Sequence, residues 1–485
     1  MNIPLMVDHA RQYISEEALD AIVRIGPIRR WALKRGERQL HEYYVENNAD
    51  RFPERVQRLR YQILSNLLNA FDHAFSEGRI SSSAWRGLVR VFVGQVVAGE
   101  DERMRPFRER FGYDPPSFLT ISPTQQCNLC CTGCYAASSA KNRATLSHDI
   151  LARVLRDKRD EWGSHFTVIS GGEPFLYSSG GRDLFDVMRE FPDIYFMIYT
   201  NGTLIDDALA ARIAAAGNIS PAISVEGWER ETDARRGRGV FHRIEKAMHS
   251  LRKHGVVFGV SMTATRENAE ALLSDEYVDF LFRDQGAVYG WVFQYMPIGR
   301  RYTVDLMVTP DQRLWMLERE LEMIERKKLF IVDFWNGGVL SAGCLAAGRS
   351  GGYFHIDWNG NVSPCVFFPY HIDNVYDIYR ENRSLSSVLE SPVFKTLRAW
   401  QHSYQGKEPA QKMKNMFIPC PMRDHYSFAR DLIQRSGAQP VNEEAALAIQ
   451  DAEYGERMEE YDQRLSRLFD PVWEKAIVNS EKDKT

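Results

Sequence analysis

Residues 117–135 read SFLTISPTQQCNLCCTGCY and join a short apolar run to four crowded cysteines. The run SFLTISPT (117–124) is typical of a buried strand, and a loop with Cys127, Cys131 and Cys134 at the spacing C-x3-C-x2-C follows it. Three thiolates from one tight loop can ligate three irons of a [4Fe–4S] cube. Because a fourth protein ligand is missing, one iron stays open, as a catalytic metal site requires. The spacing therefore predicts a cluster that binds a small molecule at its free iron.

Two other metal sites fit these cysteines less well. A structural zinc site usually takes paired ligands from each of two loops, and a ferredoxin cluster needs a fourth cysteine. Cys130 is adjacent to Cys131 and cannot easily face the same cluster, so we expect a small buried side chain there. The chain has seven cysteines, an odd number, and their crowding favours metal binding in a reducing cytoplasm over a disulfide scaffold.

Five further β-rich runs follow the first one and alternate with helical patterns. They cover residues 165–170, 195–201, 221–227, 256–265 and 288–297. Six strand–helix units in succession predict a parallel sheet with right-handed crossovers. Because six units are too few for a closed eight-stranded barrel, we expect an α/β fold built on an open, partial (β/α)6 barrel. Its chemistry should lie on loops at the C-terminal strand ends.

Four regions are expected along the chain. Residues 1–112 read as a helical N-terminal region, and residues 113–308 hold the partial barrel. A helix at about 311–328 opens a small cysteine-containing α+β domain over 309–440, and an acidic C-terminal helix and tail occupy 441–485. No internal repeat interrupts this order.

The net charge and the hydropathy of the chain indicate which classes of partner it is expected to bind. The formal net charge is -4, which gives no reason to expect nucleic acid. No run of about 18 apolar residues predicts a membrane span, and the first residues lack the pattern of a signal peptide, so we expect a cytoplasmic protein. The segment from Arg24 to Arg38 contains six basic residues and a single acidic one, Glu37. This run is typical of a solvated helical face. It also allows association with a membrane surface or an anionic substrate.

Three short motifs end the second, third and fourth strands. GGEP (171–174) supplies two glycines, which let a ligand approach the backbone, and the Glu173 carboxylate, which suits an ammonium group. YTNGTLI (199–205) contains Asn201 in a turn. SVEGWERETDARRG (224–237) adds an arginine fork suited to a carboxylate. The alternative for Arg235 and Arg236 is a surface ion pair with Glu229 or Glu231.

With the cysteine loop, these motifs resemble the radical S-adenosylmethionine (radical SAM) superfamily over about residues 115–300. The resemblance implies an enzyme whose open iron binds S-adenosylmethionine. One electron then cleaves the cofactor to a 5′-deoxyadenosyl radical, which abstracts hydrogen from a substrate. The residues implied to bind the cofactor are Tyr135, Gly171, Gly172, Glu173, Asn201, Ser224 and Arg236. Two positions depart from the family pattern: Gly133 stands where an aromatic is common, and Glu226 where Asp is common.

The remaining cysteines form a second group. Cys344 precedes a stretch in which Asn359-Gly360 reads as a two-residue hairpin turn, and Gly360 and Cys365 are spaced G-x4-C before Cys420. This pattern resembles a twitch or shortened SPASM domain and implies an auxiliary iron–sulfur cluster. The alternative is three unrelated buried thiols. Four side chains are candidates for a fourth ligand: His355, Asp357, Asp373 and His425.

The resemblance implies a flavodoxin- or ferredoxin-type electron donor and hydrogen abstraction from a peptide or protein substrate. A lipid or small-molecule substrate is the alternative for the same chemistry. A non-catalytic electron carrier and a redox-sensing interaction protein are alternatives of another class, although neither needs a cofactor pocket. The sequence identifies no general base or radical relay. Tyr295, at the end of the sixth strand, fits a substrate-facing position and core packing equally.

Overall fold

A computed structural model describes residues 26–48, 52–91, 100–405 and 413–479. Its centre is a ten-stranded sheet in the order β13-β11-β10-β1-β2-β5-β6-β7-β8-β9. The six predicted strands are confirmed and are neighbours in chain order. They are β1 (Phe118–Ile121), β2 (Phe166–Ile169), β5 (Tyr195–Thr200), β6 (Ile219–Val225), β7 (Gly259–Ala264) and β8 (Gly290–Gln294). All five pairings between them are parallel, with Phe118 opposite Phe166 and Phe166 opposite Tyr195.

Two more parallel strands extend this sheet beyond the six that were predicted. β9 (Ile331–Asp333) pairs with β8, and β10 (Tyr353–Ile356) pairs with β1. β9 and β10 lie at opposite ends of the parallel part, so the sheet stays open, as expected. β11 (Asn361–Ser363) and β13 (Asp373–Asn374) continue it antiparallel past β10. The segment with Cys344 and Cys365 is thereby joined to the edge of the barrel strands.

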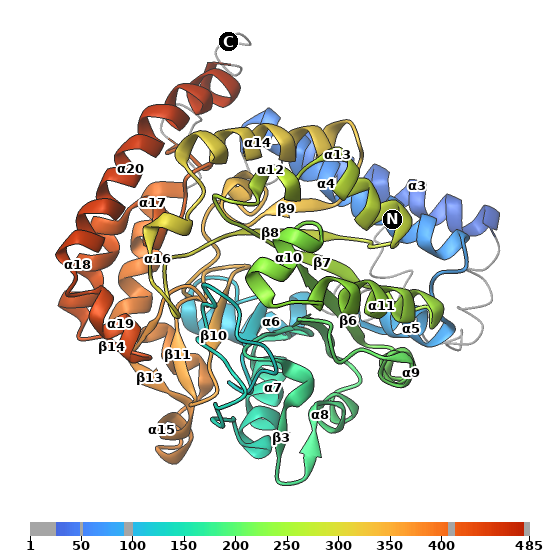
Figure 1. The fold of residues 1–485 in the computed structure, drawn as a ribbon, viewed down its shortest axis with the longest axis horizontal. Helices are drawn as coiled ribbons and strands as arrows, with labels where there is room; N and C mark the ends of the chain where they lie inside the picture. The colour runs from blue at the N-terminus through green and yellow to red at the C-terminus, as the bar shows by residue number, and fades with distance from the viewer. Residues whose placement is uncertain (1–25, 49–51, 92–99, 406–412, 480–485) are drawn as a thin grey trace.

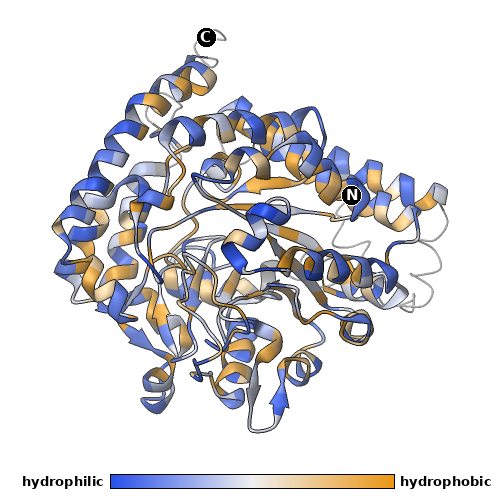
Figure 2. Cartoon of the chain, viewed as in Figure 1, coloured by the Kyte–Doolittle hydropathy of each residue, from blue (hydrophilic) through white to orange (hydrophobic). Residues whose placement is uncertain are grey.

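Helices follow the strands along the chain and surround the sheet (Figure 1). After β1 to β8 they are α7 (His148–Trp162), α8 (Leu184–Glu190), α9 (Asp207–Ala216), α10 (Glu229–Arg236), α11 (Val240–Lys253), α12 (Ala269–Leu272), α13 (Asp275–Asp279) and α14 (Pro310–Glu325). Local signals set their ends: Ser147 Oγ accepts from Ile150 N at the start of α7, and Gly163 ends it with φ +62°. Both hydrophobic and hydrophilic residues occur along α11 and α20 (Figure 2), and the buried residues of α11 recur at the spacing of one helix face.

Two helices of the predicted helical N-terminal region, α4 (Glu54–Ser76) and α5 (Ser82–Leu88), pack against the inner face of the sheet. The region also contains α3 (Gly26–His41) and α6 (Glu100–Phe111). Ile63 and Ala74 of α4 and Leu88 of α5 share one core with inward-facing Val168 and Met197. The first 25 residues, with Arg24 of the basic run, lie outside the described part. Side chains of α4 and α5 therefore fill one end of the barrel.

The C-terminal part is helical and wraps around the segments that carry the last three cysteines. Its helices are α15 (Val375–Arg380), α16 (Pro392–Gln405), α17 (Pro421–Asp424), α18 (Tyr426–Ser436), α19 (Glu443–Ala448) and α20 (Ala452–Trp473). Tyr461, Leu465 and Phe469 of α20 share a core with Val56 and Leu59 of α4. Helices α4 and α20, far apart in the sequence, therefore share one core.

Two local predictions were wrong. Cys130 is exposed, because the tight loop turns its side chain outward while its neighbours face inward. The β10–β11 hairpin has a three-residue loop, since Asp357 N still bonds to Asn361 O (3.0 Å) and Gly360 has φ +82°. Asp357 Oδ1 accepts from Asn359 N (2.8 Å) and Asn361 N (2.9 Å), which fixes the longer turn. No helix in the described ranges is long and apolar enough to cross a membrane.

Candidate active site

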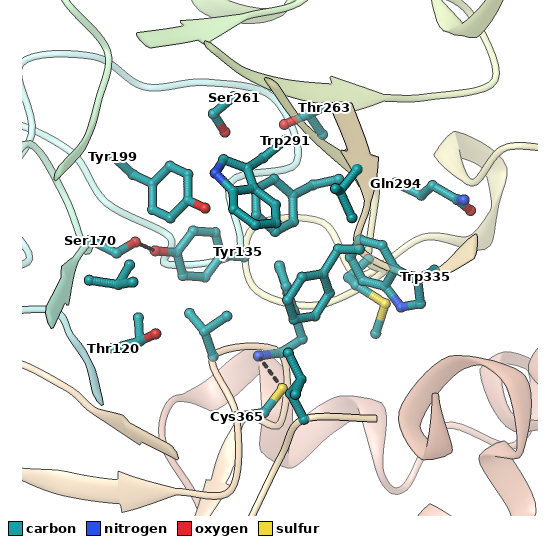
Figure 3. A pocket seen from close by; sticks show the side chains of 18 of the residues that line it. Thr120, Tyr135, Ser170, Tyr199, Ser261, Thr263, Trp291, Gln294, Trp335 and Cys365 are labelled. Carbon is teal, nitrogen blue, oxygen red and sulfur yellow. Dashed lines mark hydrogen bonds between the residues drawn. The ribbon is translucent and has the colours of Figure 1, made fainter. Parts of the chain in front are cut away.

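One cavity of about 510 Å³ lies against the inner face of the sheet and brings both cysteine groups together. Twelve of the thirteen predicted site residues line it. They are Cys127, Cys131, Cys134, Tyr135, Gly171, Gly172, Asn201, Ser224, Arg236, Cys344, Cys365 and Cys420. Figure 3 shows part of this lining, with Tyr135 bonded to Ser170 and with Cys365 at the bottom of the view. Residues more than 290 positions apart in the sequence therefore face the same space.

Arg300 holds the loop with the first three cysteines. Its guanidinium donates to Cys131 O (2.8 Å) and to Ser138 O (2.6 Å), and its backbone N–H donates to Cys134 O (3.0 Å). Gly299 precedes it with φ +65°, and a Cβ there would lie 2.3 Å from Tyr135 O. Sequence reasoning missed Arg300, because no local signal connects it to a loop 160 residues earlier.

The three thiols of this loop must lose their protons before they can ligate a metal. Burial raises the pKa of Cys127 to about 12 and raises that of Cys131, whereas the nearby Arg236 guanidinium acts against the shift at Cys131. A bound metal would displace these protons, because it ligates the thiolate. Among the described residues, no three His, Cys, Asp or Glu side chains converge on one metal ion. Three thiolates that each take a separate iron of a cube need no such convergence.

Tyr295 explains the departure at Gly133. Gly133 has φ +65°, and a Cβ there would lie 2.5 Å from Cε2 of Tyr295. The Tyr295 hydroxyl donates to Arg301 O (2.7 Å), so its ring is held against the loop from the end of β8. The space beside Cys134 is thus filled by an aromatic from another strand.

The GGEP turn is bonded to the cysteine loop. Gly172 N donates to Thr124 O (2.8 Å), and Glu173 N donates to Gln126 O (2.8 Å). A Cβ on Gly172 would lie 2.1 Å from Gln126 O, so only glycine permits this approach. The two predicted cofactor segments therefore form one rigid unit.

Glu173 lies behind that unit and does not line the cavity. Its Oε1 accepts from Thr200 Oγ1 (2.7 Å), and its Oε2 accepts from Asn201 N (2.8 Å). Burial raises the pKa of this carboxyl to about 7. In this arrangement Glu173 connects the ends of β2 and β5, and binding of an ammonium group by it stays a prediction.

Asn201 and Tyr135 contact the loop through their polar groups. Asn201 Nδ2 donates to Asn128 Oδ1 (2.9 Å) and lies 3.8 Å from Cys127 Sγ. The Tyr135 hydroxyl bonds to Ser170 Oγ (2.5 Å) and accepts from Gly171 N (3.2 Å). Both residues thus fix the position of the loop at the cavity wall.

Glu226 binds both predicted arginines. Its Oε1 accepts from Arg235 Nη1 (2.6 Å) and Arg236 Nε (2.7 Å), and its side chain is fully buried. The expected alternative of a surface pair with Glu229 or Glu231 was wrong, because α10 turns the two guanidinium groups inward. The departure from Asp therefore supplies a longer carboxylate that reaches both forks.

Arginines also hold two of the C-terminal cysteines, Cys344 and Cys420. Arg349 Nε donates to Cys344 O (2.6 Å). Cys420 N donates to Asp424 Oδ2 (3.1 Å), and the Asp424 carboxylate is bound by the fully buried Arg313. Burial raises the pKa of Cys344 and Cys420, and that of Cys365 to about 12.

Family models match both cysteine regions. The radical SAM superfamily model matches residues 121–274, and the iron–sulfur cluster-binding SPASM domain model matches residues 344–414. The chain is a radical SAM enzyme with a SPASM domain. Its cofactors are therefore a [4Fe–4S] cluster and S-adenosylmethionine in the radical SAM domain, and auxiliary iron–sulfur clusters in the SPASM domain. The predicted domain boundaries after residues 112, 308 and 440 stay a prediction.

Curated relatives are about a quarter identical to this radical SAM enzyme over the aligned residues. Mycofactocin maturase MftC of Mycolicibacterium smegmatis is 27% identical over 300 residues, which cover 60% of this chain and 72% of the relative. The AdoMet-dependent heme synthase of Methanosarcina barkeri is 26% identical, with 58% and 85% covered. The subtilosin biosynthesis protein AlbA of Bacillus subtilis is 28% identical, with 59% and 62% covered.

A solved structure supports the fold. Streptococcus suis SuiB bound to its precursor peptide SuiA aligns with a TM-score of 0.51 at 16% identity, over 66% of this chain and 75% of that one. At this identity the likeness concerns the radical SAM fold alone.

Four residues were predicted as candidates for a fourth ligand of the auxiliary cluster: His355, Asp357, Asp373 and His425. None of these four side chains lines the cavity. Asp357 is bonded in its hairpin turn, and His355 Nε2 lies 2.8 Å from Ser122 Oγ. Asp373 lies 3.6 Å from Arg383, and His425 Nε2 donates to Ile418 O (2.9 Å).

Proposed function

We propose that Cys127, Cys131 and Cys134 hold the catalytic cluster of a radical enzyme that acts on a peptide. The observation that carries this proposal is the single cavity, which places these thiols beside Asn201, Arg236 and the later cysteines. When bound, the cluster and S-adenosylmethionine supply a carbon radical that can take hydrogen from the substrate.

The protein residues bind and orient these groups. The Arg236 guanidinium faces the cavity beside Cys131 and is suited to the cofactor carboxylate, while Ser224 offers a hydroxyl. Cys344, Cys365 and Cys420 would hold an auxiliary cluster across the same space. Both sites would draw electrons from a flavodoxin- or ferredoxin-type donor in the cytoplasm.

A peptide substrate is favoured by the relatives. Two of the three curated relatives are named for the maturation of mycofactocin and the biosynthesis of subtilosin, and the solved SuiB structure contains a precursor peptide. Those names describe the relatives, and the extension to this chain is our proposal.

The proposal is tested by anaerobic reconstitution with iron, sulfide, dithionite and S-adenosylmethionine. We expect release of 5′-deoxyadenosine by the wild-type protein and none by a variant with Cys127, Cys131 and Cys134 changed to Ala. Cys130→Ala is the matched control, because this thiol is exposed outside the cavity. A cluster without cofactor cleavage would instead favour an electron carrier or redox sensor.

A lipid substrate is the second candidate, and helix α3 is the observation that favours it. Its exposed side chains include Arg30, Lys34, Arg35 and Arg38, and Trp31 is 60% exposed beside Arg35. Exposed cations and an aromatic on one helix are suited to anionic headgroups. Arg29 differs, because it pairs with Asp72 (2.5 Å).

Vesicle sedimentation separates this candidate from the first. If lipid is the substrate, anionic vesicles should bind the wild type at low salt, and changing those four cations to Ala should abolish binding. Arg29→Ala serves as the control, since this side chain is already paired. Negligible binding of the wild type to anionic vesicles would remove the lipid candidate.

A further inference from the structure

The part of the cavity between the two cysteine groups has one wall of hydroxyl groups and one of aromatic rings. The first wall comes from the inner faces of β1, β5 and β7, and Figure 3 shows its side chains. It includes Thr120, Tyr199, Ser261 and Thr263. Within the described residues, none of these four side chains makes a hydrogen bond, so each is available to a ligand.

The aromatic wall links the barrel to the SPASM domain. The Phe293 ring of β8 lies 5.6 Å from the Tyr199 ring and 5.9 Å from the Phe367 ring. Phe367 lies 5.0 Å from Trp335 and follows Cys365 by two residues. Such rings provide a large apolar surface for a flat or aliphatic group.

The charged groups of the cavity are already bonded within the protein. Arg235 and Arg236 bind Glu226, and Arg236 is assigned above to the cofactor carboxylate. Arg60 donates to Leu340 O (3.1 Å) and to Gln57 Oε1 (3.3 Å). Asp333 Oδ2 accepts from Gln294 Nε2 (2.8 Å), and its Oδ1 accepts from Trp335 N (2.9 Å). A charged substrate group between the two walls would therefore lose its hydration and would have to compete with these internal bonds for an ionic partner, which is costly.

We infer that this chamber binds an uncharged aromatic or aliphatic side chain of the peptide, with a peptide carbonyl accepting from the hydroxyl wall. The inference rests on the proposed function and names its substrate class. The Tyr199 hydroxyl stays a donor, because burial raises its pKa well above the ordinary value. The side chain would lie between the catalytic cysteines and Cys365, where a radical formed at the first cluster could reach it.

Equilibrium dialysis of reconstituted protein with bound S-adenosylmethionine tests this inference. The probes are N-acetyl-phenylalanine amide, N-acetyl-lysine amide, N-acetyl-aspartate amide and coproporphyrin III, which carries four carboxylates. We expect only the phenylalanine compound to be retained. Tyr199→Phe, and Ser261→Ala combined with Thr263→Val, should each weaken its binding about three- to tenfold, as expected for a lost neutral hydrogen bond.

Thr167→Val is the matched control, because this buried hydroxyl lies on β2 but outside the cavity. It should leave binding unchanged. No retention of the phenylalanine compound, equal binding of a charged probe, or equal affinity in the Tyr199 and Thr167 variants would overturn the inference. Release of 5′-deoxyadenosine, measured on the same preparation, reports on the proposed function separately.

Discussion

At the scale of single residues, the cysteine loop is shaped by groups that approach it from the end of β8. Arg300 binds two of its carbonyl groups, and Tyr295 occupies the space above Gly133. Neither contact involves a thiol. The loop can therefore keep its shape before any metal binds, which reduces the ordering that cluster assembly requires.

Arg300→Lys keeps the positive charge but removes the planar fork that spans Cys131 O and Ser138 O. We expect the catalytic cluster to be lost to a chelator several times faster than in the wild type, because the loop opens more often. The decay of cluster absorbance after anaerobic addition of EDTA measures this rate. Arg326→Lys is the control, since that side chain is 82% exposed. Equal decay in both variants would show that the fork does not hold the loop.

Gly133→Ala should destabilise the protein more than Gly112→Ala. Both glycines have positive φ, +65° and +75°, so both substitutions carry backbone strain of about 1–2 kcal/mol. Only at Gly133 does the new Cβ meet a ring, at 2.5 Å from Tyr295, which adds about 1–3 kcal/mol of overpacking. Urea unfolding of the two metal-free variants compares the costs. Equal free energies of unfolding would mean that the Tyr295 ring moves aside freely.

At the scale of elements, α20 supports the start of α18. Asp462 of α20 accepts through Oδ2 from Tyr426 N (2.6 Å), the first residue of α18. Burial raises the pKa of Asp462 to about 8, and Asp424 nearby adds to the shift. The folded protein thus holds a proton on this carboxyl that the unfolded chain releases near pH 4.

Protonation of Asp462 should consequently make the free energy of unfolding fall as the pH rises from about 4 to 8. A folded pKa above the unfolded value means that the native state binds the extra proton in that window, at up to about 1.4 kcal/mol per pH unit. Asp462→Asn is neutral at every pH and should remove this slope. Urea unfolding at pH 5, 6.5 and 8 measures the difference in free energy of unfolding. Parallel pH profiles for the two proteins would contradict the assignment to Asp462.

At the scale of the whole molecule, Arg313 of α14 joins the barrel to the SPASM side of the cavity. Its guanidinium binds Asn336 Oδ1 (2.9 Å), Phe417 O (3.0 Å) and the Asp424 carboxylate. Asp424 in turn accepts from Cys420 N. One buried cation therefore fixes three segments around the later cysteines.

Arg313→Met should lower the free energy of unfolding by about 3–5 kcal/mol, because it leaves Asp424 buried without its partner. In a background with Cys127, Cys131 and Cys134 changed to Ala, it should also reduce the remaining iron, which then belongs to the auxiliary site. Urea unfolding and iron analysis measure the two effects.

Adding Asp424→Leu should restore part of the stability, since no charge then stays unpaired. It should not restore the iron, because Cys420 N has lost its acceptor. Full iron content in Arg313→Met would mean that this network does not position Cys420.

The sequence by itself determined the cysteine loop and the six barrel strands. Each of these depends on residues close together along the chain, either thiol spacing or an apolar run. The motifs and the family resemblance named thirteen site residues, and the structure brings twelve of them to one cavity.

The tertiary structure alone decided the contacts between distant segments. It brought Arg300 to the cysteine loop, paired Glu226 with both arginines, and set hydroxyl groups of β5 and β7 opposite Phe367. It also turned Cys130 outward and lengthened the β10–β11 loop. These contacts depend on packing between elements far apart in the chain, and no local periodicity encodes which distant side chain will fill a given space.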